Sequence, residues 1–389
     1  MKYHGIVISD IHFGAFNSDI LMKELYSIFI KYLESLSTLD FIVITGDYFD
    51  HKTFLNERFT KHAIQFMDKL VSIAKIHKCP IRIVYGTESH EVGQYSAFSI
   101  YSDDESLDFK VIHTVEEEEL LPDMNVLYLP EEFIYSKKEY YKDYFEKKDH
   151  YDYIFGHGVI QEVMTQASKS TEKHSDTTRK KVPIFTTSEL ISICKGQVYF
   201  GHYHVNTNIM DKVFYVGSYS RWIHGEEEPK GFYHIQCKPS KEKYEQEFIE
   251  NSLARKFVTY HYGYDSKVIE SEESLLSELE KKDRIAEANE GDHVRYVFNI
   301  PEDHPNPEFV MRILNERYKF NDSIKVNVTN GYVEKKKSIN RKSLNDAMDE
   351  YPMIFDKSVK IENKVMYFIK KKFDRDVDLE QIKKYLYEG

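Results

Sequence analysis

Short apolar runs alternate with longer amphipathic stretches along the first part of the chain. Three β-branched runs bounded by turn residues predict buried strands at Gly5–Ser9, Phe41–Thr45 and Ile81–Tyr85. Between the first two, apolar residues recur every three or four positions from Ile20 to Leu36, and a second such stretch spans residues 57–77. This order of strands and helices predicts a parallel sheet built through crossover connections.

Six further apolar runs predict strands in the region that follows. They lie at Phe109–His113, Val126–Pro130, Tyr151–Gly156, Gln197–His204, Val213–Gly217 and Gly231–Cys237. Their closer spacing predicts antiparallel hairpins, whereas the first strands predict parallel pairing. We therefore expect an α/β fold, a mixed β-sandwich, over residues 1–238.

Two polar stretches interrupt this pattern. Residues 161–181 are rich in Ser, Thr and Lys and are too long for an ordinary connection, so they are either disordered or overhang a site. Residues 239–251 are mostly charged and precede a new pattern. The acidic run Glu116–Glu119 is interpreted as a solvated face.

A second, smaller domain is predicted after these residues. Alternation at His293–Ile300 and Ile324–Thr329 predicts two strands, and Pro305–Tyr318 has a helix-like pattern with a proline near its start. Together they predict a compact β-α-β domain over residues 252–331. The basic tail that follows, residues 335–389, has too few apolar residues to fold a core alone. It should dock on a partner or pack back on its own chain.

Composition and charge narrow the class of protein. The 389 residues are enough for two or three domains, and a hydrophobic content of 41% is that of a folded globular chain. The net charge of −12 repels phosphate backbones, so binding of nucleic acid would need local features that overcome this field. No apolar run is long enough to span a membrane, and three widely spaced cysteines build neither a disulfide framework nor a thiolate metal cluster. We expect a protein of a reducing cytoplasm with no membrane partner.

Carboxylate and imidazole side chains follow five of the predicted strands, at the point where each strand ends. These segments are Asp10-Ile11-His12, Gly46-Asp47-Tyr48-Phe49-Asp50, Gly86-Thr87-Glu88-Ser89-His90-Glu91, Gly156-His157 and Gly201-His202-Tyr203-His204. Open α/β sheets gather binding residues at the carboxyl ends of their strands. Oxygen and nitrogen ligands without thiolate suit Mn²⁺, Fe or Zn²⁺. More ligands are present than one tetrahedral site needs, which predicts two metals that share a carboxylate.

The order of these segments resembles that of the calcineurin-like metallophosphoesterases, over residues 1–205. A further signature, Tyr215–Ser220 followed by Gly225-Glu226-Glu227 and Lys230-Gly231-Phe232, resembles the SbcD-type DNA nuclease subunits. The resemblance implies a calcineurin-like mixed β-sandwich flanked by helices. It also implies that the predicted β-α-β domain is a DNA-capping domain and that the C-terminal tail forms short helices.

The resemblance assigns roles to the residues at the strand ends. One metal would be held by Asp10, His12 and His204, and the other by His157 and His202. Asp47 would bridge the two metals, and Asp50 would support a ligand from outside the coordination shell.

The turn that carries the catalytic histidine differs from that of the family. The family has Gly-Asn-His-Asp, which supplies a metal-binding amide and a catalytic histidine. In this chain the turn is two residues longer and has no asparagine, as in versions associated with phage-encoded members. Alignment on the histidine makes His90 the catalytic residue and places Ser89 in the asparagine's position as a metal ligand. Thr87 and Glu88 are the alternatives for that position.

The function implied by the resemblance is hydrolysis of DNA phosphodiester bonds with two divalent metal ions, Mn²⁺ first among them. The chain would be the SbcD-like subunit of a complex with an SbcC-like coiled-coil ATPase, which residues 335–389 would bind. As a homodimer it would act as exonuclease and endonuclease on double-stranded ends, single strands or hairpins in recombination, repair or replication. It would work in the cytoplasm of a bacterium, or of the host cell if phage-encoded.

Two other functions stay open on the sequence. The same metal core serves phosphoesterases that act on small-molecule or protein phosphates, and the negative charge mildly favours such a substrate. A non-catalytic scaffold is favoured by the altered turn at Thr87–His90 and opposed by the intact ligands elsewhere. Trp222 could line a substrate groove or anchor its own loop.

Overall fold

The computed structural model describes most of the first 262 residues and shorter segments beyond them. The described residues are 1–52, 54, 57–91, 93–163, 180–262, 292–298, 325–330, 353, 359–373, 377–380 and 382–383. The chain divides into two compact units, of which the first contains Met1–Tyr260 together with two later segments, and the second contains the remainder.

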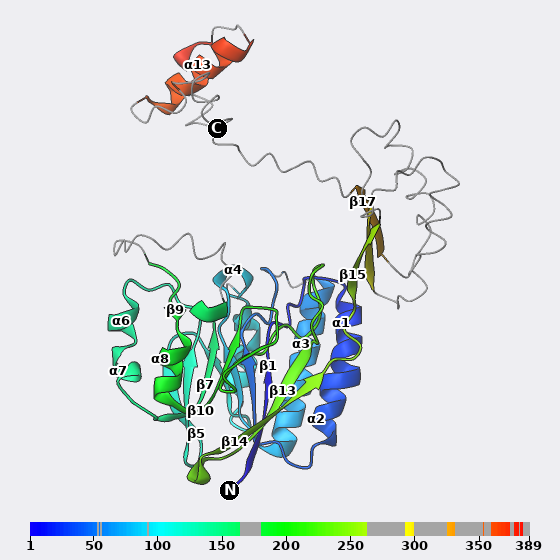
Figure 1. Cartoon of the computed structure of the whole chain (residues 1–389), viewed down its shortest axis with the longest axis vertical. Coiled ribbons are helices and arrows are strands. Elements are labelled where there is room, and N and C mark those ends of the chain that lie inside the picture. Colours follow the sequence, from blue (N-terminus) through cyan, green and yellow to red (C-terminus); the bar gives the residue numbers. More distant parts are fainter. Residues whose placement is uncertain are drawn as a thin grey trace, which may run out of the picture. The chain divides into compact units, whose positions relative to one another are not determined.

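A six-stranded sheet forms half of the first unit (Figure 1). In sheet order its strands are β14 (Lys243–Glu250), β13 (Gly231–Lys238), β1 (Tyr3–Ile8), β2 (Phe41–Thr45), β3 (Ile81–Val84) and β4 (Phe109–Ile112). Strands β1, β2, β3 and β4 pair in parallel, and β13 joins β1 and β14 in antiparallel fashion. The parallel arrangement predicted for the first three strands is therefore confirmed.

A second six-stranded sheet packs against the first. In sheet order its strands are β11 (Thr207–Ile209), β12 (Val213–Tyr215), β10 (Cys194–Gly201), β7 (Tyr151–His157), β6 (Met124–Leu129) and β5 (Glu116–Leu121). Its central pairs, β6 with β7, β7 with β10 and β10 with β12, are parallel. The prediction of antiparallel hairpins here is wrong except at the edges, because the chain returns to the same end of the sheet before each central strand. Strand β11 makes this return between β10 and β12, and short helices make it in the connections from β6 to β7 and from β7 to β10. Those helices are α6 (Lys137–Tyr140), α7 (Lys142–Phe145) and α8 (Thr187–Ile193).

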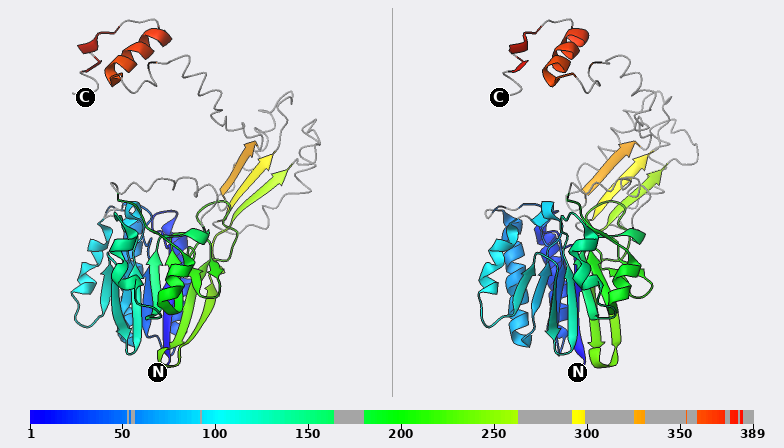
Figure 2. Two further views of the ribbon diagram at one scale, coloured as in Figure 1. Left: turned by 60° about the vertical axis from the view of Figure 1, so that its left-hand side comes forward. Right: turned by 90° about the vertical axis from the view of Figure 1, so that its left-hand side faces the viewer.

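The two sheets lie face to face between layers of helices (Figure 2). Along β1, Ile6 and Ile8 pack toward the helices while Val7 packs between the sheets, so alternate side chains enter different apolar layers. The helices outside the first sheet are α1 (Ser18–Glu24), a π-helical segment (Leu25–Ile30), α2 (Lys31–Ser35) and α3 (Arg58–His77). Helix α8 covers the outer face of the second sheet. The α/β class is thus confirmed, with two mixed sheets.

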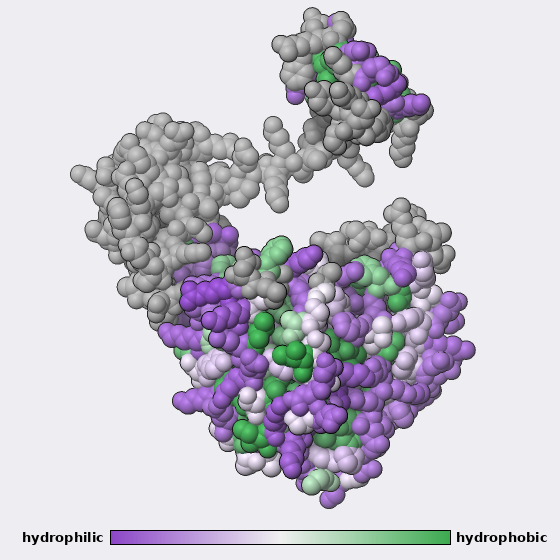
Figure 3. Space-filling view, turned by 180° about the vertical axis from the view of Figure 1, so that it is seen from behind, coloured by the Kyte–Doolittle hydropathy of each residue, from purple (hydrophilic) through white to green (hydrophobic). Residues whose placement is uncertain are grey.

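Smaller elements complete the first unit. They are α4 (Glu88–Glu91), the 3-10 helices Gln94–Phe98, Gln161–Val163 and Pro239–Lys241, α5 (Ser99–Ser102), β8 (Val159–Ile160) and β9 (Ile184–Phe185). Figure 3 shows one face of the molecule, on which hydrophilic side chains predominate and hydrophobic ones form separate small groups. Within the described ranges, none of the helices has the length and apolar character that crossing a membrane requires.

Three edge strands, β5, β11 and β14, do not follow from the sequence pattern, and β5 and β14 are rich in charged residues. The acidic run Glu116–Glu119, interpreted as a solvated face, lies within β5, where Glu118 forms an ion pair with Arg82 at 2.7 Å between Oε1 and Nε. The charged stretch 239–251 contains β14, which pairs with β13 along its length. Both strands lie at sheet edges, where one face meets solvent and charged side chains are tolerated, so the apolar pattern that marks a buried strand is missing.

The later segments bear on the second predicted domain and the tail. Strands β15 (Phe257–Tyr262), β16 (His293–Phe298) and β17 (Lys325–Asn330) form a three-stranded sheet in that order, which confirms the two strands expected there. Helix α13 (Ile361–Phe373) confirms a helix in the tail. The helix expected at 305–318, most of the polar stretch 161–181 and the basic run after Gly331 lie outside the described residues. The boundaries 1–238, 252–331 and 335–389 stay predictions.

Candidate metal centre

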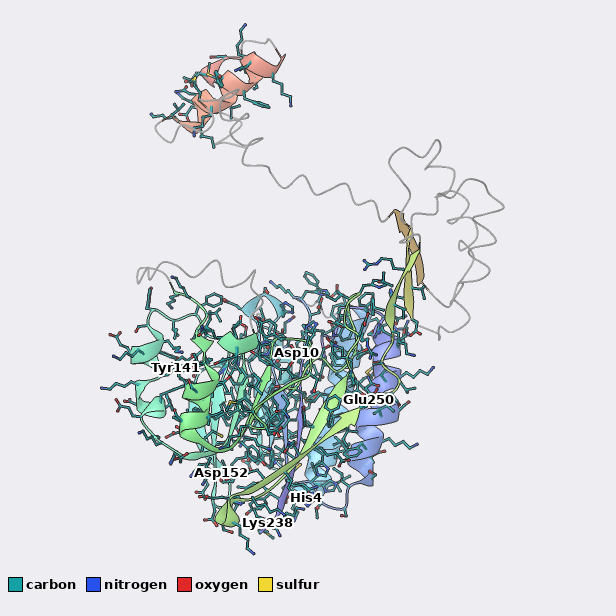
Figure 4. The ribbon with its side chains drawn as sticks, viewed as in Figure 1. His4, Asp10, Tyr141, Asp152, Lys238 and Glu250 are labelled. Carbon is teal, nitrogen blue, oxygen red and sulfur yellow. The ribbon has the colours of Figure 1, made fainter. Side chains whose placement is uncertain are left out.

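The candidate ligands meet where the central strands of both sheets end. Asp10 lies at this end, whereas His4 and Lys238 lie at the opposite end of the same sheet (Figure 4). The loops after β1 and β2 are joined by backbone hydrogen bonds, from the amide of Asp10 to the carbonyl of Gly46 (3.1 Å) and from that of His12 to Asp47 (3.0 Å). Parallel strands therefore deliver these side chains to one place, as the sequence predicts.

Four of the candidate ligands have a left-handed backbone, which non-glycine residues rarely adopt. The φ angle is +48° at Asp10, +52° at His12, +47° at Asp47 and +98° at His202. Each such residue costs about 1–3 kcal/mol, and such residues gather at functional sites where the surrounding structure holds them. The hydrogen bonds between the two loops provide that restraint for Asp10, His12 and Asp47, and a hydrogen bond from the amide of His202 to Oδ1 of Asp10 provides it for His202.

The first group of ligand atoms comes from Asp10, His12 and His204. Nε2 of His12 lies 3.0 Å from Nε2 of His204 and 3.8 Å from Oδ1 of Asp10. The other ring nitrogen of His204, Nδ1, lies 2.7 Å from Oε1 of Glu226. A carboxylate in that position keeps the proton on Nδ1 and leaves Nε2 free to bind a metal.

The second group centres on His157, which lies at the end of β7. Its Nδ1 donates a hydrogen bond to the carbonyl of Thr45 at 2.8 Å, so Nε2 is the atom that could bind a metal. Burial would lower the pKa of His157, but the carboxylate of Asp47 outweighs burial and raises it to about 10, so a metal that binds Nε2 would displace a proton. Two glycines make room for the ring, because a Cβ would lie 2.2 Å from Nδ1 at Gly46 and 2.8 Å from it at Gly201. Gly46 also has a φ of +86°, which favours glycine.

His202 completes this second group from the loop after β10. Its backbone amide donates to Oδ1 of Asp10 at 3.1 Å, which ties the two groups of ligands together. Its Nδ1 lies 3.3 Å from Oε2 of Glu131, and the ligand atoms of Glu131, His157 and His202 all lie within 4.8 Å of one another. Burial lowers the pKa of His202 to about 4, so the ring is neutral at physiological pH, the form that binds metals.

Asp47 lies between the two groups. Its Oδ2 is 3.9 Å from Nε2 of His12 and 3.4 Å from Nε2 of His157. Burial alone would raise the pKa of Asp47, but the neighbouring imidazoles, His157 foremost, outweigh burial and lower it. Asp47 is therefore an ionised carboxylate in contact with both sets of ligands.

His90 and Asp50 flank the first group. Nδ1 of His90 is 4.0 Å from Oδ2 of Asp47, and the rings of His90 and His12 are 5.2 Å apart. This Nδ1 atom is buried and has no hydrogen-bond partner in the described part of the chain, and burial lowers the pKa of His90. Oδ1 of Asp50 lies 3.3 Å from Nδ1 of His12, on the side of that ring away from His204, which suits the supporting role expected of Asp50.

The turn after β3 brings Thr87, rather than Ser89, to the centre. Oγ1 of Thr87 lies 3.4 Å from Oδ2 of Asp47, from Nε2 of His157 and from Nδ1 of His202. Ser89 and Glu88 are exposed on the short helix α4, and among the described residues Glu88 belongs to no group of His, Cys, Asp and Glu ligand atoms. Thr87 was one of the three residues considered for the asparagine's position.

Three glutamates around the centre were not assigned a role from the sequence. Glu131 and Glu226 contact His202 and His204 as described, and Glu91 is buried, with Oε2 accepting from the amide of Gly86 at 2.5 Å. Burial raises the pKa of Glu91 to about 8. Glu131 could have been found from the sequence, because it follows the predicted strand Val126–Pro130 just as the other ligands follow theirs. Glu226 lies within the quoted signature.

The buried histidine and carboxylate groups could hold a metal ion. The donors are nitrogen and oxygen atoms, and the unpartnered Nδ1 of His90 and Oε2 of Glu131 point to a species that the protein atoms alone do not provide. Trp222 is 4% exposed, and its ring lies 6.0 Å from that of His12, so it anchors its loop beside the centre.

In comparison with known proteins, no family model matches the chain, and no curated protein matches it. Among solved structures, 55 chains match. One of them has 11% sequence identity and a TM-score of 0.35, over 64% of this chain and 100% of its own. That similarity is too low to support an inference about function.

Proposed function

We propose that this chain is a DNA nuclease that uses two divalent metal ions, Mn²⁺ above all, and acts as an SbcD-like subunit. The observation that carries the proposal is the position of Asp47, whose Oδ2 lies within 4.0 Å of nitrogen atoms from both groups of ligands. One ion would be held by Asp10, His12 and His204, and the other by His157 and His202. Asp47 would bridge the two.

The protein's own residues prepare the site for hydrolysis. Two bound divalent ions would lower the pKa of a shared water and neutralise the oxygens of the phosphate. Nδ1 of His90 is buried and faces Asp47, which leaves Nε2 to meet the substrate. From there His90 would donate a hydrogen bond to a phosphoryl oxygen and protonate the leaving oxygen. Thr45 and Glu226 would hold His157 and His204 in the tautomers that bind metal.

Two features favour a polymeric substrate over a small phosphate. The side chains of His90, His202 and His204 are 27–30% exposed, so the centre is open at the surface. The signature that resembles the SbcD group is also built into the centre, because Nζ of Lys230 donates to the carbonyl of His204 at 2.7 Å. The net charge of −12 favours the alternative, a phosphoesterase of small-molecule or protein phosphates.

The partner would be an SbcC-like coiled-coil ATPase, and the chain would form a homodimer. Helix α13 has apolar residues at helical spacing, Ile361, Val365, Phe368 and Ile369, and carries Lys370, Lys371 and Lys372 in its last turn. Such a helix is of the kind that lies with its apolar face in a groove of another protein.

The test is cleavage by the purified full-length protein. Linear double-stranded, single-stranded and hairpin DNA would be compared with p-nitrophenyl phosphate and a phosphopeptide, in Mn²⁺ and in EDTA. Mn²⁺-dependent DNA cleavage that is lost in Asp47→Ala and kept in the exposed control Asp103→Ala supports the proposal. DNA cleavage that persists in EDTA or in Asp47→Ala contradicts it, and hydrolysis of the small phosphates alone supports the alternative.

A further inference from the structure

Glu131 presents a buried carboxylate oxygen beside the ligand atoms of His157 and His202. The residue is 7% exposed, and its Oε2 has no hydrogen-bond partner among the described residues. A buried carboxylate is normally hydrogen-bonded, paired with a cation, or neutralised. The unsatisfied atom lies 3.3 Å from Nδ1 of His202.

The backbone fixes Glu131 in this position. The residue follows β6, and its amide donates to the carbonyl of Tyr85 at 3.2 Å, so the ends of β6 and β3 are tied together. Tyr85 directly precedes the Gly86-Thr87 turn. Glu131 therefore reaches the metal centre from the strand next to β7, which carries His157.

The contact between Glu131 and His202 is itself informative. If Nδ1 of His202 is the nitrogen that binds metal, it carries no proton, and it faces Oε2 of Glu131 as one acceptor faces another. Oγ1 of Thr87 lies 3.4 Å from the same Nδ1. The Thr87 hydroxyl can donate as well as accept, but Nδ1 of His202 and Oε2 of Glu131 are then two acceptors that face each other, as happens when a cation is to lie between them.

We propose that Glu131 is a ligand of the ion held by His157 and His202, an inference that rests on the metal pair of the proposed function. Glu131 would take the place of the amide that the family's asparagine supplies and that this chain lacks. Thr87 lies nearer to that position in the chain, but its hydroxyl is neutral and one bond shorter than an amide side chain. An anionic oxygen from Glu131 would give the second site one more negative charge than an asparagine would, and so a tighter hold on a divalent cation.

The test measures Mn²⁺ binding to the full-length protein by titration calorimetry and by electron paramagnetic resonance, without DNA. The wild-type protein should bind two ions. Glu131→Ala should weaken one of them by at least about 10-fold, the scale seen when support of a metal ligand is lost. Glu131→Gln, which keeps an amide oxygen but loses the charge, should weaken it less. Glu139→Gln, an exposed residue on α6, is the matched control and should bind as wild type does.

Thermal unfolding separates a lost ligand from a damaged fold. Without metal, Glu131→Gln should be at least as stable as wild type, because it replaces an unpaired buried carboxylate, yet Mn²⁺ should raise its Tm by less. If Glu131→Ala binds as many Mn²⁺ ions as wild type, with the same affinity, the inference is overturned while the nuclease proposal stays intact. A wild-type protein that binds no pair of ions would instead overturn the proposed function itself.

Discussion

Glu226 holds the imidazole of His204 through a contact of 2.7 Å between Oε1 and Nδ1. The other carboxylate oxygen of Glu226 accepts from the backbone amide of Trp222 at 2.8 Å, and Nζ of Lys230 lies 3.6 Å from it. The segment that resembles the SbcD signature is thus fastened to a candidate metal ligand. A carboxylate in this position orients the ring and makes its far nitrogen a better ligand.

Replacing Glu226 by Gln should therefore weaken Mn²⁺ binding by about 10- to 100-fold. The amide preserves the volume but no longer fixes the proton on Nδ1 of His204. Titration calorimetry on the metal-free protein measures the effect, with the exposed neighbour variant Glu227→Gln as the matched control. Equal affinities in the two variants would show that the contact does not matter for the metal.

His90→Ala and His90→Asn should keep both metals and lose most of the turnover, about 10²- to 10⁴-fold for one acid-base group. The metal content, measured by atomic absorption, should therefore stay at the wild-type level while the rate of DNA cleavage falls. His113→Gln, which lies outside the groups of ligand atoms, should leave both unchanged. If His90→Ala loses metal along with rate, His90 is a ligand, as its grouping with His12 and Asp50 would allow.

Ser89→Ala and Thr87→Ala test the assignment of the turn. Because Ser89 is exposed while Thr87 lies against Asp47 and His157, we expect unchanged Mn²⁺ binding in Ser89→Ala. Weaker Mn²⁺ binding at the second site in Ser89→Ala would instead favour the alignment on His90, which makes Ser89 a metal ligand.

The central strands and most of the site could be predicted from the sequence, because both follow from local patterns. Buried parallel strands are continuous apolar runs, and in such a sheet the residues after each run meet at one edge. Asp10, Asp47, His157 and His202 were found by that rule alone. Glu131 obeys the same rule but has no counterpart in the family motif, so the resemblance assigns it no role.

The remaining differences have physical causes that the sequence hides. Thr87, which directly follows Gly86, contacts Asp47, whereas Ser89, the residue that alignment on His90 selects, is exposed on α4. Which residue of the turn reaches the centre depends on how the longer turn folds, and alignment of the sequence does not fix that. Strand β14 has alternating exposed positions rather than an apolar run. Strand direction in the second sheet depends on how the chain returns between strands, which spacing alone does not fix.

A pair of histidines far from the metal centre predicts how stability depends on pH. Nδ1 of His4 lies 3.2 Å from Nε2 of His234, and burial lowers the pKa of both below the ordinary 6.5. In the window between 6.5 and the native value, the unfolded chain binds more protons, so the free energy of unfolding falls as pH decreases through it. Urea unfolding from pH 8 to pH 5 should show a shallower fall in His234→Gln. Parallel curves for variant and wild type would contradict this.

A buried ion pair joins the first helix to the segment after β14. Nε of Arg255 lies 3.7 Å from Oε1 of Glu24, and both side chains are almost fully buried. Glu24→Ala should lower the free energy of unfolding by about 3–5 kcal/mol, because it leaves the guanidinium buried without its counter-charge. Lys142→Ala, which breaks the exposed pair with Glu146, should change it by less than about 1 kcal/mol. Similar values for the two variants in urea unfolding would contradict the argument.

The tail offers the last prediction. From Lys335 to Gly389 it has fourteen basic and ten acidic residues, against a chain whose net charge is −12, and it contains the amphipathic helix α13. Deletion of the residues after Gly331 should leave Mn²⁺-dependent cleavage of single-stranded DNA largely intact, because every candidate ligand lies before residue 205. The same deletion should abolish co-purification with an SbcC-like ATPase encoded alongside, since it removes the apolar residues that would lie in a groove of that partner. A truncated chain that is insoluble or inactive would mean that the tail belongs to the fold of the nuclease, because a helix that only binds a partner contributes nothing to the metal centre.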